Sequence, residues 1–134
     1  MKEHHKIWEQ KIVTAMNSIG WNLTLSENEY EHYDAYGKTP KGFDCVIELK
    51  RRHKYYADKV MEVYKYEKLM EMECLKFYYV FDTRGNYLFL LDKLELPCSL
   101  LIQSSETTVF NKKNIIDKRV YFLSESKAIL KNII

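Results

Sequence analysis

Residues 43 to 50 constrain the fold more than any other stretch, because they read as a strand whose two faces differ. One face carries Phe43, Cys45, Ile47 and Leu49, and the other carries Asp44, Val46, Glu48 and Lys50. Charged groups on so apolar a strand are unusual, since a buried charge is costly unless a partner offsets it. The stretch therefore predicts a core strand, about Phe43 to Leu49, with a charged front.

The first part of the chain adds a helix and two strands to this one. Apolar residues at helical spacing predict a helix over about residues 4 to 19, ended by Gly20. Strands are expected at 21 to 25 and at 30 to 36, followed by a loop whose turn-forming residues span 37 to 42. The order therefore begins with a helix and three strands.

The second part of the chain predicts a helix over about residues 56 to 75, which contain no Gly or Pro. Two aromatic strands, 76 to 81 and 87 to 91, flank a turn at 82 to 86 and predict a hairpin. The pattern then weakens. Short strands at 107 to 110 and 120 to 123 and a terminal helix from Ser124 are expected there. The whole order predicts an α/β domain with a mixed sheet.

The chain length, the hydrophobic content and the net charge restrict the class of protein. A chain of 134 residues with 46% hydrophobic residues is expected to form one domain over 1–134. We expect its core at about 5–91 and an irregular C-terminal extension over 92–134. The net charge of +2 excludes a protein-wide basic field, so any nucleic-acid footprint must be local.

The cysteines and the N-terminal sequence point to a cytoplasmic protein. Cys45, Cys74 and Cys98 are odd in number and form no CxxC pair, which favours reduced thiols over disulfides or structural zinc. The N-terminal residues lack the apolar core of a signal peptide, and no apolar run approaches the roughly 20 residues of a membrane span. We expect no membrane association.

Three acids and a lysine form the most informative group. Asp34 lies fourteen positions before Glu48, Lys50 follows Glu48 by two, and Glu9 lies in the first helix. On one strand, residues two apart project from the same face roughly 6.6 Å apart, so Glu48 and Lys50 can address one phosphate. Phosphodiester hydrolysis uses a divalent cation held by carboxylates, and a lysine beside the attacking water assists it. The group therefore predicts a phosphodiesterase site.

These residues resemble the PD-(D/E)xK nuclease superfamily, which has the restriction-endonuclease-like fold, over about residues 5 to 91. Asp34 corresponds to the family's acid on the second strand, and Glu48 and Lys50 correspond to its third-strand pair. Glu9 matches the first-helix glutamate of archaeal Holliday-junction resolvases and several small phage nucleases. Tyr33 stands where the family has a proline.

The resemblance implies an αβββαβ core, with a central mixed sheet flanked by helices, and a Mg²⁺- or Mn²⁺-dependent DNA endonuclease. The implied metal ligands are Glu9, Asp34, Glu48 and the backbone carbonyl of Leu49. Lys50 would position the water, and the second helix would add the accessory residues Glu62, Lys65 and Tyr66. No separate DNA-reading domain is visible, so we expect recognition of DNA structure rather than of a long sequence. A homodimer built on the aromatic hairpin or the C-terminal region is expected, in a bacterial or archaeal cell, with a phage or mobile-element gene.

Several readings of these residues remain open. If the loop after the second strand is long, Asp34 faces Glu48. If the hairpin closes tightly, Asp34 faces Asp44 and Glu48 lies about 13 Å away, too far to share a metal. Glu9 can also serve the helix dipole alone. The basic residues Arg51, Arg52 and Lys54 predict phosphate contacts, although a solvated loop would have the same composition.

Two other classes of function remain open. One is a nucleic-acid-binding module on the same fold without turnover, although pure binding has no need for acids that repel phosphate. The other is a structural or interaction protein whose charged strand face is incidental. The second class predicts that nothing depends on a divalent metal.

Overall fold

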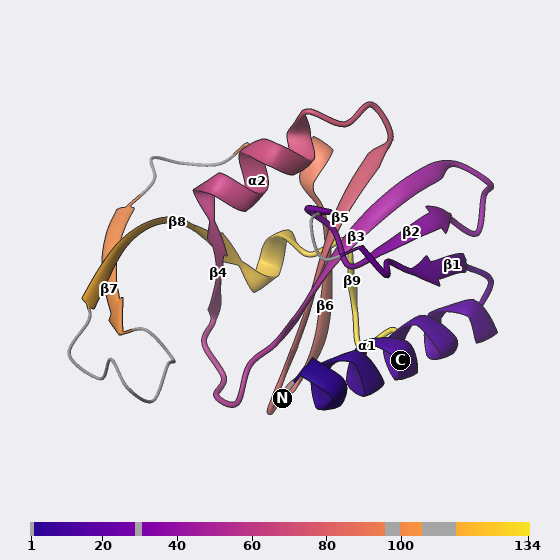
Figure 1. The fold of residues 1–134 in the computed structure, drawn as a ribbon, viewed down its shortest axis with the longest axis horizontal. Coiled ribbons are helices and arrows are strands. Elements are labelled where there is room, and N and C mark those ends of the chain that lie inside the picture. Colours follow the sequence, from indigo (N-terminus) through magenta and orange to yellow (C-terminus); the bar gives the residue numbers. More distant parts are fainter. Residues whose placement is uncertain (1, 29–30, 96–99, 106–114) are drawn as a thin grey trace.

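The computed structural model describes residues 2–28, 31–95, 100–105 and 115–134 (Figure 1). The described elements are α1 (Lys2–Ser18), β1 (Asn22–Leu25), β2 (Ala35–Lys38), β3 (Asp44–Arg51), β4 (Asp58–Glu62), α2 (Val63–Met70), β5 (Leu75–Asp82), β6 (Gly85–Leu90), η1 (Leu91–Lys93), β7 (Leu100–Ser105), β8 (Ile115–Ser124), η3 (Glu125–Lys127) and β9 (Leu130–Lys131). They form a six-stranded sheet, β1-β2-β3-β5-β6-β9, and a three-stranded sheet, β4-β8-β7. No helix among the described residues is long and apolar enough to cross a membrane.

The six-stranded sheet is mixed, as the sequence predicts. Strands β1, β2 and β3 form an antiparallel meander, β3 runs parallel to β5, and β5 returns through a hairpin to β6. A parallel neighbour needs a crossover, and the segment that holds β4 and α2 provides it. Strand β3 thus has a hydrogen-bonded neighbour on each side and lies in the middle of the sheet (Figure 1).

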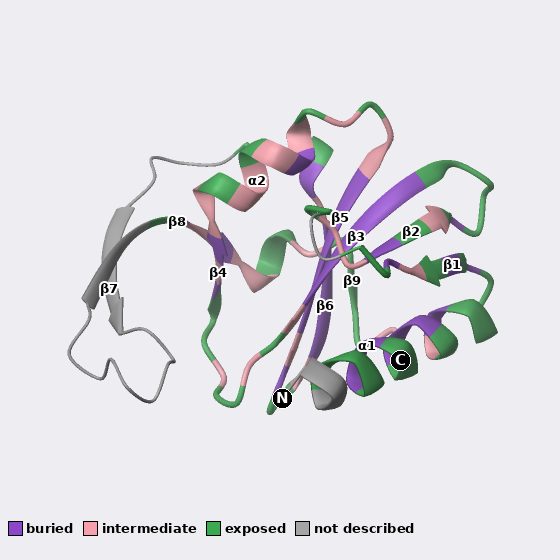
Figure 2. Cartoon of the chain, viewed as in Figure 1, coloured by how far each residue is buried: buried purple, intermediate pink, exposed green. Residues whose placement is uncertain are grey.

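Two apolar cores lie on opposite faces of this sheet. On one face, α1 packs through Trp8 and Met16 against Ile47 and Leu49 of β3. On the other face, side chains of α2, β4 and β8 pack against Val46 of β3 and its neighbours on β5 and β6. The middle of β3 is therefore buried on both faces (Figure 2). Any charge on its front must have partners inside the protein.

The sequence pattern predicts one helix over residues 56 to 75, and this prediction is wrong. The first part of the segment forms β4 instead. Residues 58 to 62 alternate between buried and less buried positions, with Lys59 and Met61 inside, and they pair with Val120–Ser124 of β8. Helix α2 begins only at Val63. A strand partner almost sixty residues away overrides the local helical periodicity here.

The C-terminal region is also more regular than the sequence indicates. Residues 120 to 123 belong to β8, as expected, but the expected helix from Ser124 is wrong: the one-turn 3₁₀ segment η3 is followed by β9. Strand β9 extends the six-stranded sheet by pairing with Tyr87 and Leu88 of β6. The described part of 92–134 is therefore not an irregular extension. The strand expected at 107 to 110 lies outside the described residues.

The predicted hairpin of β5 and β6 is present, but its aromatic side chains do not form a surface. Tyr78, Tyr79, Tyr87 and Phe89 are all buried in the two cores. These rings are therefore not available to a dimer interface, and the expected homodimer stays a prediction.

Candidate active site

The register between β2 and β3 decides which acid lies beside Glu48. Ala35 pairs with Ile47 and Lys38 pairs with Asp44, across a loop formed by residues 39 to 43. Asp34, directly before β2, donates its N–H to the Ile47 carbonyl at 2.9 Å, and its Oδ2 accepts the Leu49 N–H at 2.8 Å. Asp34 therefore lies next to Glu48, as the long-loop alternative requires.

Asp44, the competing acid, is outside this group. Its Oδ1 lies 2.6 Å from Nζ of Lys38 on the neighbouring strand, and both side chains are exposed. The predicted second strand is shifted, because residues 31 to 34 lie outside any strand and β2 instead includes Gly37 and Lys38. The composition of a loop conceals this strand, since Gly and Lys are weak strand formers.

Glu9, Asp34 and Glu48 come from three elements and form one acidic cluster. Glu9 of α1 and Glu48 of β3 are buried, and Asp34 is half-buried. Burial, reinforced by the charge of Asp34, raises the pKa of Glu9 to about 7 and that of Glu48 to about 8. Asp34 thus acts on both glutamates and favours their protonated forms, whereas a bound cation would favour the charged forms.

Two basic side chains contact the cluster from opposite sides. Nζ of Lys65, on α2, lies 2.7 Å from Oε2 of Glu48. Burial lowers the pKa of Lys65, but Glu48, Asp34 and Glu62 together outweigh the effect of burial, so the pKa of Lys65 is raised. On the α1 side, Nε2 of His5 lies 3.1 Å from Oε2 of Glu9. The spacing of four residues between His5 and Glu9 was the signal in the sequence for this contact.

Lys50 follows Glu48 on the same face of β3 and has a different environment from Lys65. Burial, together with the positive charges of Arg52 and Lys65, lowers the pKa of Lys50. Among the described residues Lys50 has no ion-pair partner within 4.0 Å. Its ammonium group is thus available to a ligand beside Glu48.

The residue types of the cluster fit a hard divalent cation, because carboxylate oxygens are the ligands that Mg²⁺ and Mn²⁺ prefer. Within the described residues, however, no three acidic, His or Cys side chains already surround one ion position. Glu48 faces Lys65, Glu9 faces His5, and Asp34 accepts the Leu49 N–H. Binding of an ion therefore requires Glu48 and Glu9 to turn from Lys65 and His5, whereas Asp34 can keep the Leu49 N–H on its Oδ2.

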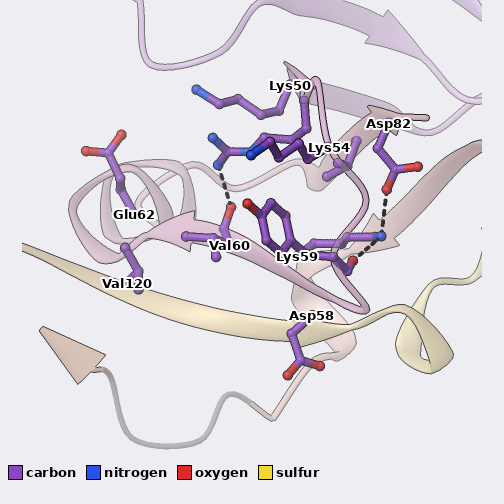
Figure 3. Close-up of a pocket in the computed structure, with 11 residues that line it drawn as sticks. Lys50, Lys54, Asp58, Lys59, Val60, Glu62, Asp82 and Val120 are labelled. Atoms are coloured by element: carbon purple, nitrogen blue, oxygen red, sulfur yellow. Dashed lines mark hydrogen bonds and ion pairs between the residues drawn. The ribbon is translucent and has the colours of Figure 1, made fainter. Parts of the chain in front are cut away.

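The remaining predicted site residues separate into two groups. Arg51 points to the α1 face, with its guanidinium carbon 5.9 Å from the centre of the Trp8 ring, and Tyr66 packs on Tyr121 with ring centres 5.2 Å apart. Neither contacts the acidic cluster. Arg52, Lys54 and Glu62 instead line a cavity of about 240 Å³ together with Lys50 (Figure 3).

A buried ion pair, which the sequence does not predict, lies in this cavity away from Lys50. Nζ of Lys59 lies 2.8 Å from Oδ2 of Asp82, and both side chains are almost fully buried (Figure 3). Lys59 falls within the segment expected to be helical, and Asp82 falls within the expected turn. Nothing local in the sequence indicates that β4 brings them together.

Comparison with known proteins identifies the fold. No protein-family profile and no curated protein matches the sequence. The structure is similar to that of Hjc from Archaeoglobus fulgidus, a Holliday junction resolvase from an archaeal hyperthermophile, with a TM-score of 0.60 and 13% sequence identity. The match covers 94% of this chain and 88% of that chain. The expected fold is confirmed: this chain has the restriction-endonuclease-like fold of Hjc, with a central mixed sheet and two helices.

Proposed function

We propose that this chain is a divalent-metal-dependent DNA endonuclease that recognises DNA structure, such as a branch point, rather than a long sequence. The observation that carries the proposal is the convergence of Glu9, Asp34 and Glu48 beside Lys50, which has no ion-pair partner in the described part of the chain. Like charges are costly to gather in a buried place, and packing gives no reason to do so. The similarity of fold to a Holliday junction resolvase supports a structured DNA as substrate.

In this proposal, Glu9, Asp34 and Glu48, with the carbonyl of Leu49, would hold a Mg²⁺ or Mn²⁺ ion. When bound, the ion would supply charge neutralisation at the phosphate and a more acidic water. Asp34 is already oriented by the Leu49 N–H. Lys50 orients the attacking water and stabilises the negative charge that develops on the phosphate. Water attacks in line with the leaving oxygen, without a covalent intermediate. Cutting two strands requires two such sites, and we propose a homodimer.

The test is incubation of plasmid, single-stranded and four-way-junction DNA with Mg²⁺ or Mn²⁺. We expect metal-dependent cleavage, strongest on the junction. Glu48→Ala and Lys50→Ala should each lower the cleavage rate by about a hundredfold or more. Asp44→Ala is a matched control, because Asp44 lies on the same strand face but outside the acidic cluster. It should keep full activity.

The other outcomes separate the competing functions. Binding of DNA without cleavage under either metal would favour a nucleic-acid-binding module on this fold. Neither binding nor any effect of metal would favour a structural or interaction protein. Equal losses in Asp44→Ala and Glu48→Ala would contradict the assignment of the site to the cluster.

A further inference from the structure

A cavity of about 240 Å³ opens beside Lys50 and is not explained by the acidic cluster (Figure 3). It lies between the two sheets, since β3 and β5 provide one side and β4 and β8 provide the other. Its apolar walls come from three valines, Val60, Val80 and Val120. Its volume is below that of a pocket for a drug-sized ligand, typically about 300 Å³ or more, and suits a smaller group.

The rim of this cavity carries three cations. Lys50 lies on the front of β3 beyond Glu48, Arg52 comes directly after the strand, and Lys54 follows in the segment between β3 and β4. Figure 3 draws Lys50 and Lys54 at a distance from Asp58. Lys59 and Asp82 neutralise each other in a buried pair, which leaves Asp58 and Glu62 as the acids that face the three cations. The cavity therefore has a net positive charge at the end that adjoins the acidic cluster.

The orientation of the rim cations suits an anionic ligand. Arg52 is held in place, because its Nη2 donates to the Val60 carbonyl at 3.3 Å. Lys54, like Lys50, has no ion-pair partner among the described residues. Residues two apart on a strand are separated by roughly 6.6 Å, so Lys50 lies one such step from Glu48 on β3. Arg52 comes directly after the strand, where its backbone N–H donates to the Phe81 carbonyl at 2.8 Å.

A phosphate alone does not account for the apolar walls or for Tyr56, an aromatic residue at the cavity with 59% of its surface exposed. Bases stack on aromatic side chains and pack against apolar ones, whereas phosphates bind lysine and arginine. We propose that the cavity binds one unpaired deoxynucleotide of the DNA strand, next to the bond that is cut. The base contacts the valines and Tyr56, and its phosphate contacts Arg52 and Lys54. This inference rests on the proposed function and sharpens it.

The proposal defines the substrate class. A paired nucleotide would have to leave its stack to enter the cavity, which is unfavourable, whereas an unpaired nucleotide can enter without unstacking. The preferred substrate is therefore DNA with an unpaired nucleotide beside the cut, such as a flap, a gap or a distorted branch point. A perfectly paired duplex should be a poor substrate.

Nucleotide binding is tested without cleavage, on the full chain in EDTA. Thymidine 5′-monophosphate, thymidine and inorganic phosphate are titrated separately and followed by calorimetry. The monophosphate should bind at least about fivefold more tightly than either fragment. Lys54→Gln and Tyr56→Ala should each weaken it by about fivefold, whereas Lys41→Gln, an exposed lysine in the loop between β2 and β3, should not. Equal affinity for inorganic phosphate, or no effect of Tyr56→Ala, would overturn the assignment of the base.

A cleavage comparison separates this proposal from the proposed function. A duplex with one unpaired nucleotide at the cut should be cleaved faster than the fully paired duplex, and Tyr56→Ala should reduce the difference. Cleavage of both at the same rate, without binding of the monophosphate, would overturn the subsite and leave the endonuclease intact. Binding of the monophosphate without cleavage of any DNA would support the subsite and overturn the endonuclease.

Discussion

The ammonium group of Lys65 lies 2.7 Å from a carboxylate oxygen of Glu48, and 42% of the Lys65 side chain is exposed against 6% of that of Glu48. An accessible cation on α2 thus balances a buried acid on β3. Asp34 acts on the same carboxylate in the opposite direction. Burial disfavours the charge of Glu48 most, and two neighbours of opposite sign then adjust it, so a change in either neighbour should be visible in activity or stability.

Replacement of Lys65 by Met should make the enzyme less active at neutral pH. Lys65 lowers the pKa of Glu48, so without it Glu48 keeps its proton to higher pH. The acidic limb of the pH–rate profile should move up by about one pH unit or more, and Lys65→Arg should restore it. An unchanged limb in Lys65→Met would mean that the ionisation of Glu48 does not limit cleavage.

The metal-free protein should lose stability as the pH rises. The folded pKa values of Glu9 and Glu48, about 7 and about 8, lie above the ordinary value of 4.5, so the folded state binds more protons between these limits. The contribution of these two glutamates to the free energy of unfolding is therefore complete below about pH 4.5. It falls by a few kcal/mol as the pH rises to 8. Urea denaturation in EDTA from pH 5 to pH 9 measures this. Glu48→Gln should reduce the fall, and a slope as steep as that of the unaltered protein would contradict the assignment.

The buried pair of Lys59 and Asp82 should be critical for stability. Lys59→Met leaves Asp82 buried without its cation, which typically costs about 3–5 kcal/mol. A matched exposed pair is Lys38 with Asp44, where Lys38→Met should cost less than about 1 kcal/mol. Urea denaturation of both variants gives the comparison. Similar losses in the two would show that burial does not distinguish these pairs.

Gly37 should tolerate no side chain. A methyl group there would lie 2.0 Å from the backbone oxygen of Asn22, on β1, and φ is 151°. Gly37→Ala should therefore separate β1 from β2 and destabilise the protein by several kcal/mol. At Gly42, φ is 88° and the space is open, so Gly42→Ala should cost only the conformational strain, about 1–2 kcal/mol. The two free energies of unfolding, measured side by side, test this difference.

The sequence reveals the parts of this protein whose signals are local. Three such signals depend only on neighbouring residues: the apolar stripe of α1, the two different faces of β3, and the turn between β5 and β6. Each of these predictions agrees with the structure. The register of Asp34 follows from the loop residues between β2 and β3. The grouping of the acids can thus be predicted from the sequence, while their roles stay predictions.

The missed features depend on contacts that are distant in sequence. Residues 58 to 62 have an ambiguous pattern that only the pairing with β8 resolves as a strand. The 240 Å³ cavity and the pair of Lys59 with Asp82 follow from that pairing, so they could not be predicted either. Likewise, the carbonyl of Leu88 accepts the N–H of Ile129, a contact between β6 and the end of the described chain that no local pattern indicates.

The order in which the ribosome makes these elements has a consequence for the nascent chain. Every acid of the cluster is made before β5, the central neighbour of β3, and well before β8 and β9. The acids are therefore synthesised before the strand that covers the edge of β6 and before the cavity wall that β8 provides. Closure of the molecule depends on its last strands, so the cavity cannot be complete until translation of this region has ended.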